Sequence, residues 1–152
     1  MENIIKFETG VREFNINGAV TVSFCPTDMN FVETVFDVLE DIDRFHTEYQ
    51  EKAEKISENP DEKAASEEMF DLSRDADNTI REKINGLFGK DICTPTIGHG
   101  SILSPAGGLP IWANIIFMLI DLFDDELVKE KEKTNPRIKK YTEKYKKRSA
   151  RK

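Results

Sequence analysis

The longest apolar run of the chain covers residues 109–123 and reads LPIWANIIFMLIDLF. Pro110 suits the first turn of a helix, where its fixed φ is favourable and its missing N–H costs nothing. The apolar positions that follow lie around most of such a helix instead of forming one stripe. We therefore expect residues 110–128 to form a central helix that also contacts a partner or a second copy. The residues expected to make this contact are Ile111, Trp112, Ile115, Ile116, Leu119 and Phe123.

A membrane-spanning role for this helix is disfavoured by its length and by its polar positions. A span needs about 18 or more consecutive apolar residues, and this run is shorter. Asn114 and Asp121 also interrupt it, and ionisable groups are costly inside a bilayer. We expect no contact with a membrane.

Alternating apolar residues predict a β segment over residues 1–25, with a hairpin around Asn17-Gly18. One strand carries Phe14 and Ile16 on one face, and the other carries Val20, Val22 and Phe24 on one face. A two-residue loop would place these sets on opposite faces of the sheet, because side chains alternate with period two. We therefore predict a three-residue turn with Gly18 in the left-handed conformation. Residues 4–7 are expected to add a third strand.

Helical spacing of apolar residues predicts an antiparallel pair of helices over residues 27–56 and 60–86, joined by a short connection. The candidate caps of the first helix are Thr27, Asp28 and Asn30, of which Asn30 has capping-box spacing with Glu33. Asn59 as cap, with Pro60 and Glu62 after it, marks the start of the second helix. Gly86 is the expected C-terminal cap. Residues 90–109 are predicted to be a Gly/Pro-rich loop. The seam positions are Phe31, Val35, Val38, Ile42, Phe45, Tyr49 and Ile56 in the first helix and Ala65, Met69, Leu72, Ala76, Ile80 and Ile84 in the second.

The charges divide the chain into an acidic body and a basic tail. Residues 1–128 carry a net charge of −16, whereas residues 129–152 carry +9. The fold class expected is α+β and mostly α-helical, with a hairpin or small antiparallel sheet, a helix pair, an apolar third helix and the tail. Ile138, Tyr141 and Tyr145 have helical spacing in the tail. The tail residues expected to contact an anionic partner are Lys139, Lys140, Tyr141, Lys144, Tyr145, Lys147 and Arg148.

Catalytic and cofactor motifs give little support to an enzyme. His46 lies beside the apolar seam of the first helix, so we expect a half-buried packing residue. His99, with Cys93 or Ser104 as nucleophile, is the one candidate for hydrolysis, and we expect no catalysis from it. Residues 86–90 read GLFGK, which is too short between its glycines for a P-loop. We expect no metal and no cofactor, and reduced cysteines in a cytoplasm.

The order of these parts resembles the tail assembly chaperones of long-tailed bacteriophages and prophages, of the Gram-positive type. The matching pieces are residues 14–18 (FNING) with the strand after them, and residues 84–90 (INGLFGK) followed by the apolar helix. The resemblance implies a non-enzymatic helical oligomer that binds the tape measure protein in the cytoplasm of a bacterial host. The alternative is a nucleic-acid- or ribosome-associated adaptor that uses the basic tail, with phosphates neutralised by lysines and bases stacked on tyrosines.

Overall fold

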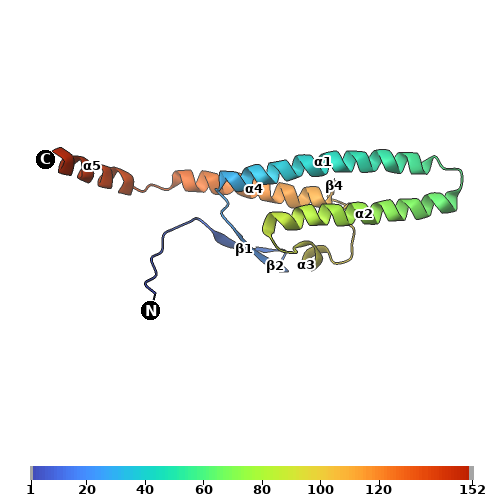
Figure 1. The fold of residues 1–152 in the computed structure, drawn as a ribbon, viewed down its shortest axis with the longest axis horizontal. Coiled ribbons are helices and arrows are strands. Elements are labelled where there is room, and N and C mark those ends of the chain that lie inside the picture. Colours follow the sequence, from blue (N-terminus) through green and yellow to red (C-terminus); the bar gives the residue numbers. More distant parts are fainter. Residues whose placement is uncertain (1, 151–152) are drawn as a thin grey trace.

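The computed structural model describes residues 2–150, and of residues 147–150 only the backbone. The fold is α+β and mostly helical, as the sequence predicts (Figure 1). Its elements in chain order are β1 (Arg12–Ile16), β2 (Val20–Phe24), α1 (Met29–Ser57), α2 (Glu62–Phe88), α3 (Cys93–Ile97), β3 (Pro105–Ala106), β4 (Leu109–Pro110), α4 (Ile111–Glu132) and α5 (Arg137–Ala150).

The hairpin has the register and the loop that its apolar pattern requires. Ile16 pairs with Val20 and Phe14 pairs with Val22, so three residues form the turn. Gly18 has a φ of 71°, which is the left-handed conformation predicted for it. The apolar side chains of both strands therefore share one face, and Ile16, Val20, Val22 and Phe24 are buried there.

The prediction of a third strand over residues 4–7 is wrong. Residues 2–11 lie outside any strand, and Ile4, Ile5 and Phe7 are largely exposed. The hairpin does not need this strand, because its apolar face packs on the helices: the ring centroid of Phe24 lies 5.0 Å from that of Phe31 on α1 and 6.4 Å from that of Phe123 on α4. Helix packing supplies the support that an isolated hairpin lacks in water.

The antiparallel pair of α1 and α2 is confirmed (Figure 1), and residues of both predicted seams are buried. The buried seam residues are Val35 and Ile42 in α1 and Ala76, Ile80 and Ile84 in α2. Asp28, one of the three candidate caps, is the N-cap of α1, whereas the prediction of Asn59 as the cap of α2 is wrong. The side chain of Asp28 accepts the N–H of Asn30 at 3.0 Å, and Asp61 accepts the N–H of Ala64 at 3.2 Å.

The C-terminal cap of α2 is Gly89, not Gly86, so the predicted end at residue 86 is also wrong. Gly89 has a φ of 62° and its N–H binds the carbonyl oxygen of Asn85. The helix continues past Gly86 because Leu87 and Phe88 pack against the core. The burial of these two side chains outweighs the weak helix propensity of Gly86, which precedes them in the helix.

Helix α4 is central to the fold, as predicted, and it packs along α1. Its buried side chains include Ile116 and Leu119, which are almost completely inaccessible. The helix extends to Glu132, so the expected limit at residue 128 falls inside it. Lys129 and Lys131 lie in its last turn, where positive charge interacts favourably with the helix dipole.

The Gly/Pro-rich segment of residues 90–109 contains regular structure, in place of the loop predicted from its composition. It includes the short helix α3 and the two-residue strands β3 and β4, which pair as Pro105 with Pro110 and Ala106 with Leu109. At the far end of the chain, α5 is separate from the body (Figure 1). Its helical conformation confirms the spacing of Ile138, Tyr141 and Tyr145.

Candidate partner-binding groove

The six residues of α4 predicted to contact a partner divide into two groups. Four of them form part of the protein's own core, with exposed fractions of 5% or less: Trp112, Ile116, Leu119 and Phe123. Ile111 and Ile115 are half-buried. The four core side chains are therefore not accessible to a partner in this structure. The apolar residues that remain on the surface of α4 include Phe117 and Met118, each 38% exposed.

A groove runs between the β-hairpin and the C-terminal half of α4. The groove has two parts, and the first has a volume of about 430 Å³. Asn15, Asp121 and Asp125 bring polar groups to this first part. Apolar side chains from both strands and from the helix form the rest of its lining, namely Phe14, Ile16, Phe24, Met118, Leu119 and Leu122. The groove is therefore apolar inside and acidic along the α4 side.

A second hollow, of about 390 Å³, continues the groove toward the N-terminus of α4. Ile16 and Met118 line both parts, so the two hollows adjoin at these side chains. The second part is bounded by α3 and β3, and its apolar lining includes Ile92, Ile97, Ile111 and Ile115. Two of the predicted contact residues, Ile111 and Ile115, thus belong to the groove. We refer to the two parts together as the hairpin–α4 groove.

An ion pair holds the hairpin against α4 on one side of the groove. The guanidinium of Arg12 donates a hydrogen bond to the carboxylate of Glu126, whose side chain is only 10% exposed. This hydrogen bond lowers the pKa of Glu126 below its ordinary value, against the effect of desolvation. The carboxylate is therefore charged at neutral pH, and the pair fixes the distance between β1 and the helix.

Polar residues at every fourth position of α2 hold the other side of the groove. Asp77 and Arg81 form an ion pair with an N–O distance of 3.1 Å. Arg81 also donates to the carbonyl oxygens of Gly98 and Gly100, and Asp77 accepts the N–H of Ile102 at 2.8 Å. These bonds satisfy the backbone of the segment that follows α3 and hold it against α2.

Asn85 continues this polar stripe of α2 one turn further. Its side-chain oxygen accepts the N–H groups of Ile92 and Cys93 at 2.9 and 3.2 Å. Its amide group donates to Asp91, which also accepts the N–H of Thr94 at 3.1 Å. Sequence reasoning missed this stripe, because the spacing of Asp77, Arg81 and Asn85 is also that of an ordinary solvated helix face. It positions α3, which lines the second part of the groove.

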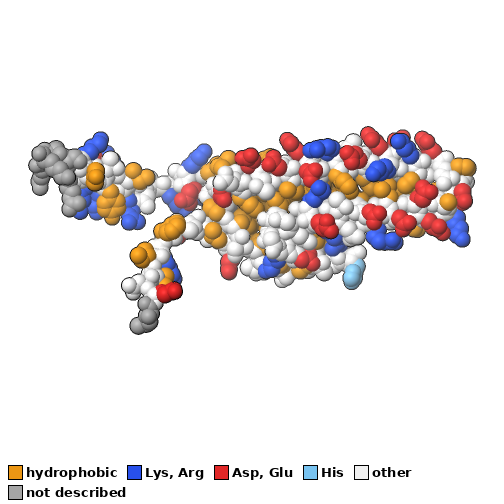
Figure 2. Space-filling model, in the orientation of Figure 1, with side chains coloured by type: hydrophobic (Ala, Val, Ile, Leu, Met, Phe, Trp, Pro, Cys, Tyr) orange, Lys and Arg blue, Asp and Glu red, His pale blue; other side chains and the backbone are white. Residues whose placement is uncertain are grey.

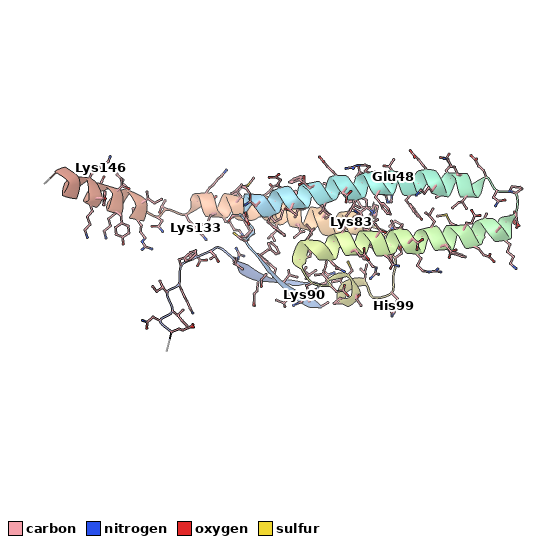
Figure 3. The ribbon with its side chains drawn as sticks, viewed as in Figure 1. Glu48, Lys83, Lys90, His99, Lys133 and Lys146 are labelled. Atoms are coloured by element: carbon pink, nitrogen blue, oxygen red, sulfur yellow. The ribbon has the colours of Figure 1, made fainter. Side chains whose placement is uncertain are left out.

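The residues predicted to bind an anionic partner are carried by α5. Lys139, Lys140, Tyr141, Lys144 and Tyr145 are exposed on this helix. Figure 3 shows Lys146 on α5 and Lys133 at its junction with α4. The predicted contacts Lys147 and Arg148 belong to α5, but their side chains lie outside the described residues. Figure 2 shows acidic and basic side chains mixed along α1 and α2, whereas the charged side chains on α5 are mostly basic.

The hydrolytic candidate has unfavourable geometry for a thiol nucleophile. Cys93 is buried, and this burial raises the pKa of its thiol to about 11. His99 is exposed, and Figure 3 shows it pointing away from the body. Because the thiolate is the nucleophilic form, a thiol with this pKa reacts slowly at neutral pH. His46 is half-buried, as expected, with its ring centroid 5.6 Å from that of Trp112.

The described part of the chain has neither a cluster of candidate metal ligands nor an apolar helix of membrane-spanning length. Its side chains include no cluster of three or more His, Cys, Asp or Glu arranged to hold a metal ion. Among the same residues, no helix combines the length and the apolar character needed to cross a bilayer. In comparisons with known proteins, no family model, curated protein or solved structure gives a significant match to this chain.

Proposed function

We propose that this protein is a non-enzymatic tail assembly chaperone of a long-tailed bacteriophage or prophage, which binds the tape measure protein in the cytoplasm of the bacterial host. The observation that carries the proposal is the hairpin–α4 groove. It offers two adjoining apolar hollows on a rigid base of helix and hairpin. Such a groove suits the apolar face of an amphipathic helix, and a tape measure protein is a very long helical client.

The shape of the groove and the residues around it support a binding role without catalysis. Exposed apolar area on a small domain marks a contact site for a protein partner. Met118 lies where the two parts of the groove meet, and its flexible thioether adapts to varied side chains. A chaperone that binds successive segments of one long client needs this tolerance more than it needs strict shape complementarity.

Co-expression with the tape measure protein of the same phage tests this proposal. We expect the wild-type chain to keep the client in the soluble fraction and to co-purify with it. The variant Met118→Lys places a charge in the groove and should lose both effects. Phe117→Lys is a matched control, because Phe117 has the same exposed fraction of 38% and does not line the groove. A monomeric protein that never retains the client would overturn the proposal.

A second candidate function rests on the exposed basic helix α5. Its lysines and two tyrosines would neutralise phosphates and stack on bases in a nucleic-acid- or ribosome-associated adaptor. This function predicts binding of RNA or DNA that weakens steeply as salt is raised. It also predicts that removal of residues 133–152 abolishes the binding, whereas Met118→Lys leaves it unchanged.

A further inference from the structure

Helix α5 presents an apolar face that the described residues leave uncovered. Ile138, Tyr141 and Tyr145 are 84%, 52% and 73% exposed, although their helical spacing places them on one side. An isolated helix of 14 residues is marginally stable in water, because nucleation is costly and few hydrogen bonds repay it. A stable α5 therefore requires a surface on which this face can pack.

The first part of the hairpin–α4 groove matches this face in length. Met118 and Asp125 mark its two ends on α4 and are seven residues apart. Ile138 and Tyr145, the ends of the apolar face of α5, are also seven residues apart. At a rise of 1.5 Å per residue, each interval is about 10 Å long. One helix can therefore lie along the other with its three apolar side chains inside the groove.

The charges are complementary as well. Asp121 and Asp125 line the α4 side of the groove and are four residues apart, which places them on one face of the helix. On α5, Arg137 and Lys144 lie at one edge of the apolar face, two turns apart, and both are exposed. Lysine and arginine side chains are long enough to cover apolar surface while their charged groups reach outward to a carboxylate.

Helix α5 does not lie in the groove of its own chain. Lys133 follows α4 in an extended conformation, with a ψ of 136°. Helix α5 then continues away from the body, beyond the end of α4 (Figure 1). We propose that α5 of a second copy of this chain lies in the hairpin–α4 groove, with its apolar face inward and with Arg137 and Lys144 beside Asp121 and Asp125.

This contact joins two different surfaces, α5 of one copy and the groove of another. A closed assembly therefore forms when two copies exchange their α5 helices or when several copies form a ring. The area buried by a single helix in a groove is small compared with the about 1,200–2,000 Å² of a standard interface. Reciprocal exchange of the two helices doubles this buried area. The contact also covers Met118. If the groove is the client site, as the proposed function states, α5 shields it until the client displaces the helix.

Light scattering after size-exclusion chromatography of the purified full-length protein tests the docking without any client. The wild type should have the mass of a dimer or a larger oligomer, with weaker association at high salt. Both Asp121→Lys/Asp125→Lys and Arg137→Glu/Lys144→Glu should dissociate it to monomers. The combined variant with all four changes should associate again, because the two charges are exchanged across the contact.

Two controls separate this contact from a general effect of charge or of stability. Glu51→Lys/Glu54→Lys makes the same change in net charge as the groove variant, on the exposed side of α1, and should leave the mass unchanged. Circular dichroism shows whether each variant is folded. An equimolar mixture of the groove variant and the α5 variant should restore association even if one of them is less stable alone. A wild-type monomer at every concentration would overturn the proposal.

Two further outcomes would also overturn it. One is an oligomer that persists in both charge variants. The other is an oligomer that depends on residues 2–9, whose apolar side chains Ile4, Ile5 and Phe7 are exposed, and not on α5. None of these results requires the tape measure protein, so failure of the docking and failure of the chaperone function are distinguishable.

Discussion

Arg12 at the start of β1 is paired with the buried carboxylate of Glu126 on α4, across 114 residues of sequence. This pair joins the two elements that form the first part of the hairpin–α4 groove. A carboxylate that is taken out of water is stable only when it is paired and hydrogen-bonded. Glu126 is also approached by Lys129, whose ammonium lies 3.5 Å away. The width of the groove therefore depends on an electrostatic contact as well as on packing.

Acid should weaken this contact. The pKa of Glu126 is lowered in the folded protein, chiefly by the hydrogen bond from Arg12. Its contribution to stability is therefore fully present above the unfolded pKa of about 4.3 and is lost as pH falls through the lower folded pKa. We expect the melting temperature of the wild type to decrease below about pH 4 more than that of Glu126→Gln.

Thermal unfolding followed by circular dichroism from neutral pH to strongly acidic pH provides the comparison. Asp41 and Asp91 also have lowered pKa values, because of hydrogen bonds from Lys83 and from Thr94. Their contributions remain in Glu126→Gln, so the variant should reduce the acid dependence without removing it. Identical pH profiles for both proteins would show that the Arg12–Glu126 pair does not stabilise the fold.

The polar stripe of α2 should be more important for stability than its sequence indicates. Arg81→Met removes the donor to the carbonyl oxygens of Gly98 and Gly100 and leaves Asp77, whose side chain is 18% exposed, without its ionic partner. The expected loss is about 1–3 kcal/mol of unfolding free energy. Urea denaturation measures this loss, and hydrogen exchange should increase at residues 98–102.

Arg74→Met is the matched control on the same helix. Arg74 pairs with Asp71 on the surface, where the two side chains are 67% and 73% exposed. Exposed pairs contribute about 0–1 kcal/mol, so this variant should remain close to the wild type. Equal effects of the two substitutions would mean that the contacts of Arg81 with the segment after α3 add nothing.

Gly86 and Gly89 should respond to alanine in opposite directions. Gly86 lies inside α2, and no atom is within 4 Å of a Cβ added to it, so Gly86→Ala should stabilise the protein by about 0.8–1.0 kcal/mol. Gly89 has a φ of 62°, which disfavours a side chain by about 1–2 kcal/mol. Chemical denaturation of both variants measures the change in unfolding free energy and its sign. A destabilising effect of Gly86→Ala would indicate that the helix ends at residue 86.

The two cysteines should differ in their reactivity toward alkylating reagents. Burial raises the pKa of the Cys93 thiol to about 11, whereas Cys25 is partly exposed. We expect one thiol, Cys25, to be modified in the native protein at neutral pH and Cys93 to react only in denaturant. Mass spectrometry after timed alkylation identifies the modified residue. Rapid modification of Cys93 would instead indicate an activated thiol and would revive a catalytic role.

Much of the fold is predictable because it depends on periodicity. The apolar residues of the two strands share one face only if the loop between the strands has an odd number of residues. The pairing of Ile16 with Val20 leaves a loop of three. The seams of α1 and α2 follow from helical spacing for the same reason. The conformation of residues 4–7 was not predictable in this way. The apolar residues Ile4, Ile5 and Phe7 are compatible with a third β-strand and also with an exposed segment outside the sheet. Composition alone does not distinguish these outcomes.

The location of the groove was harder to predict than the helix that forms it. Apolar residues occur around most of α4, so the sequence cannot indicate which side α1 covers and which side remains open. The structure buries Trp112 and Ile116 and leaves Met118 at the surface. The stripe of α2 was equally hidden, since polar residues on a helix usually face solvent. Here Arg81 and Asp77 bind the backbone of a segment 17 to 25 residues away in sequence.

The most direct test of the central claim is a tagged pull-down from the native host during prophage induction, at moderate salt, with identification of the proteins and nucleic acids that co-purify. We predict recovery of one very long, helix-rich structural protein with the wild type and with Phe117→Lys, and its loss with Met118→Lys. Recovery of nucleic acid or ribosomes in its place would contradict the chaperone function and would assign the activity to α5.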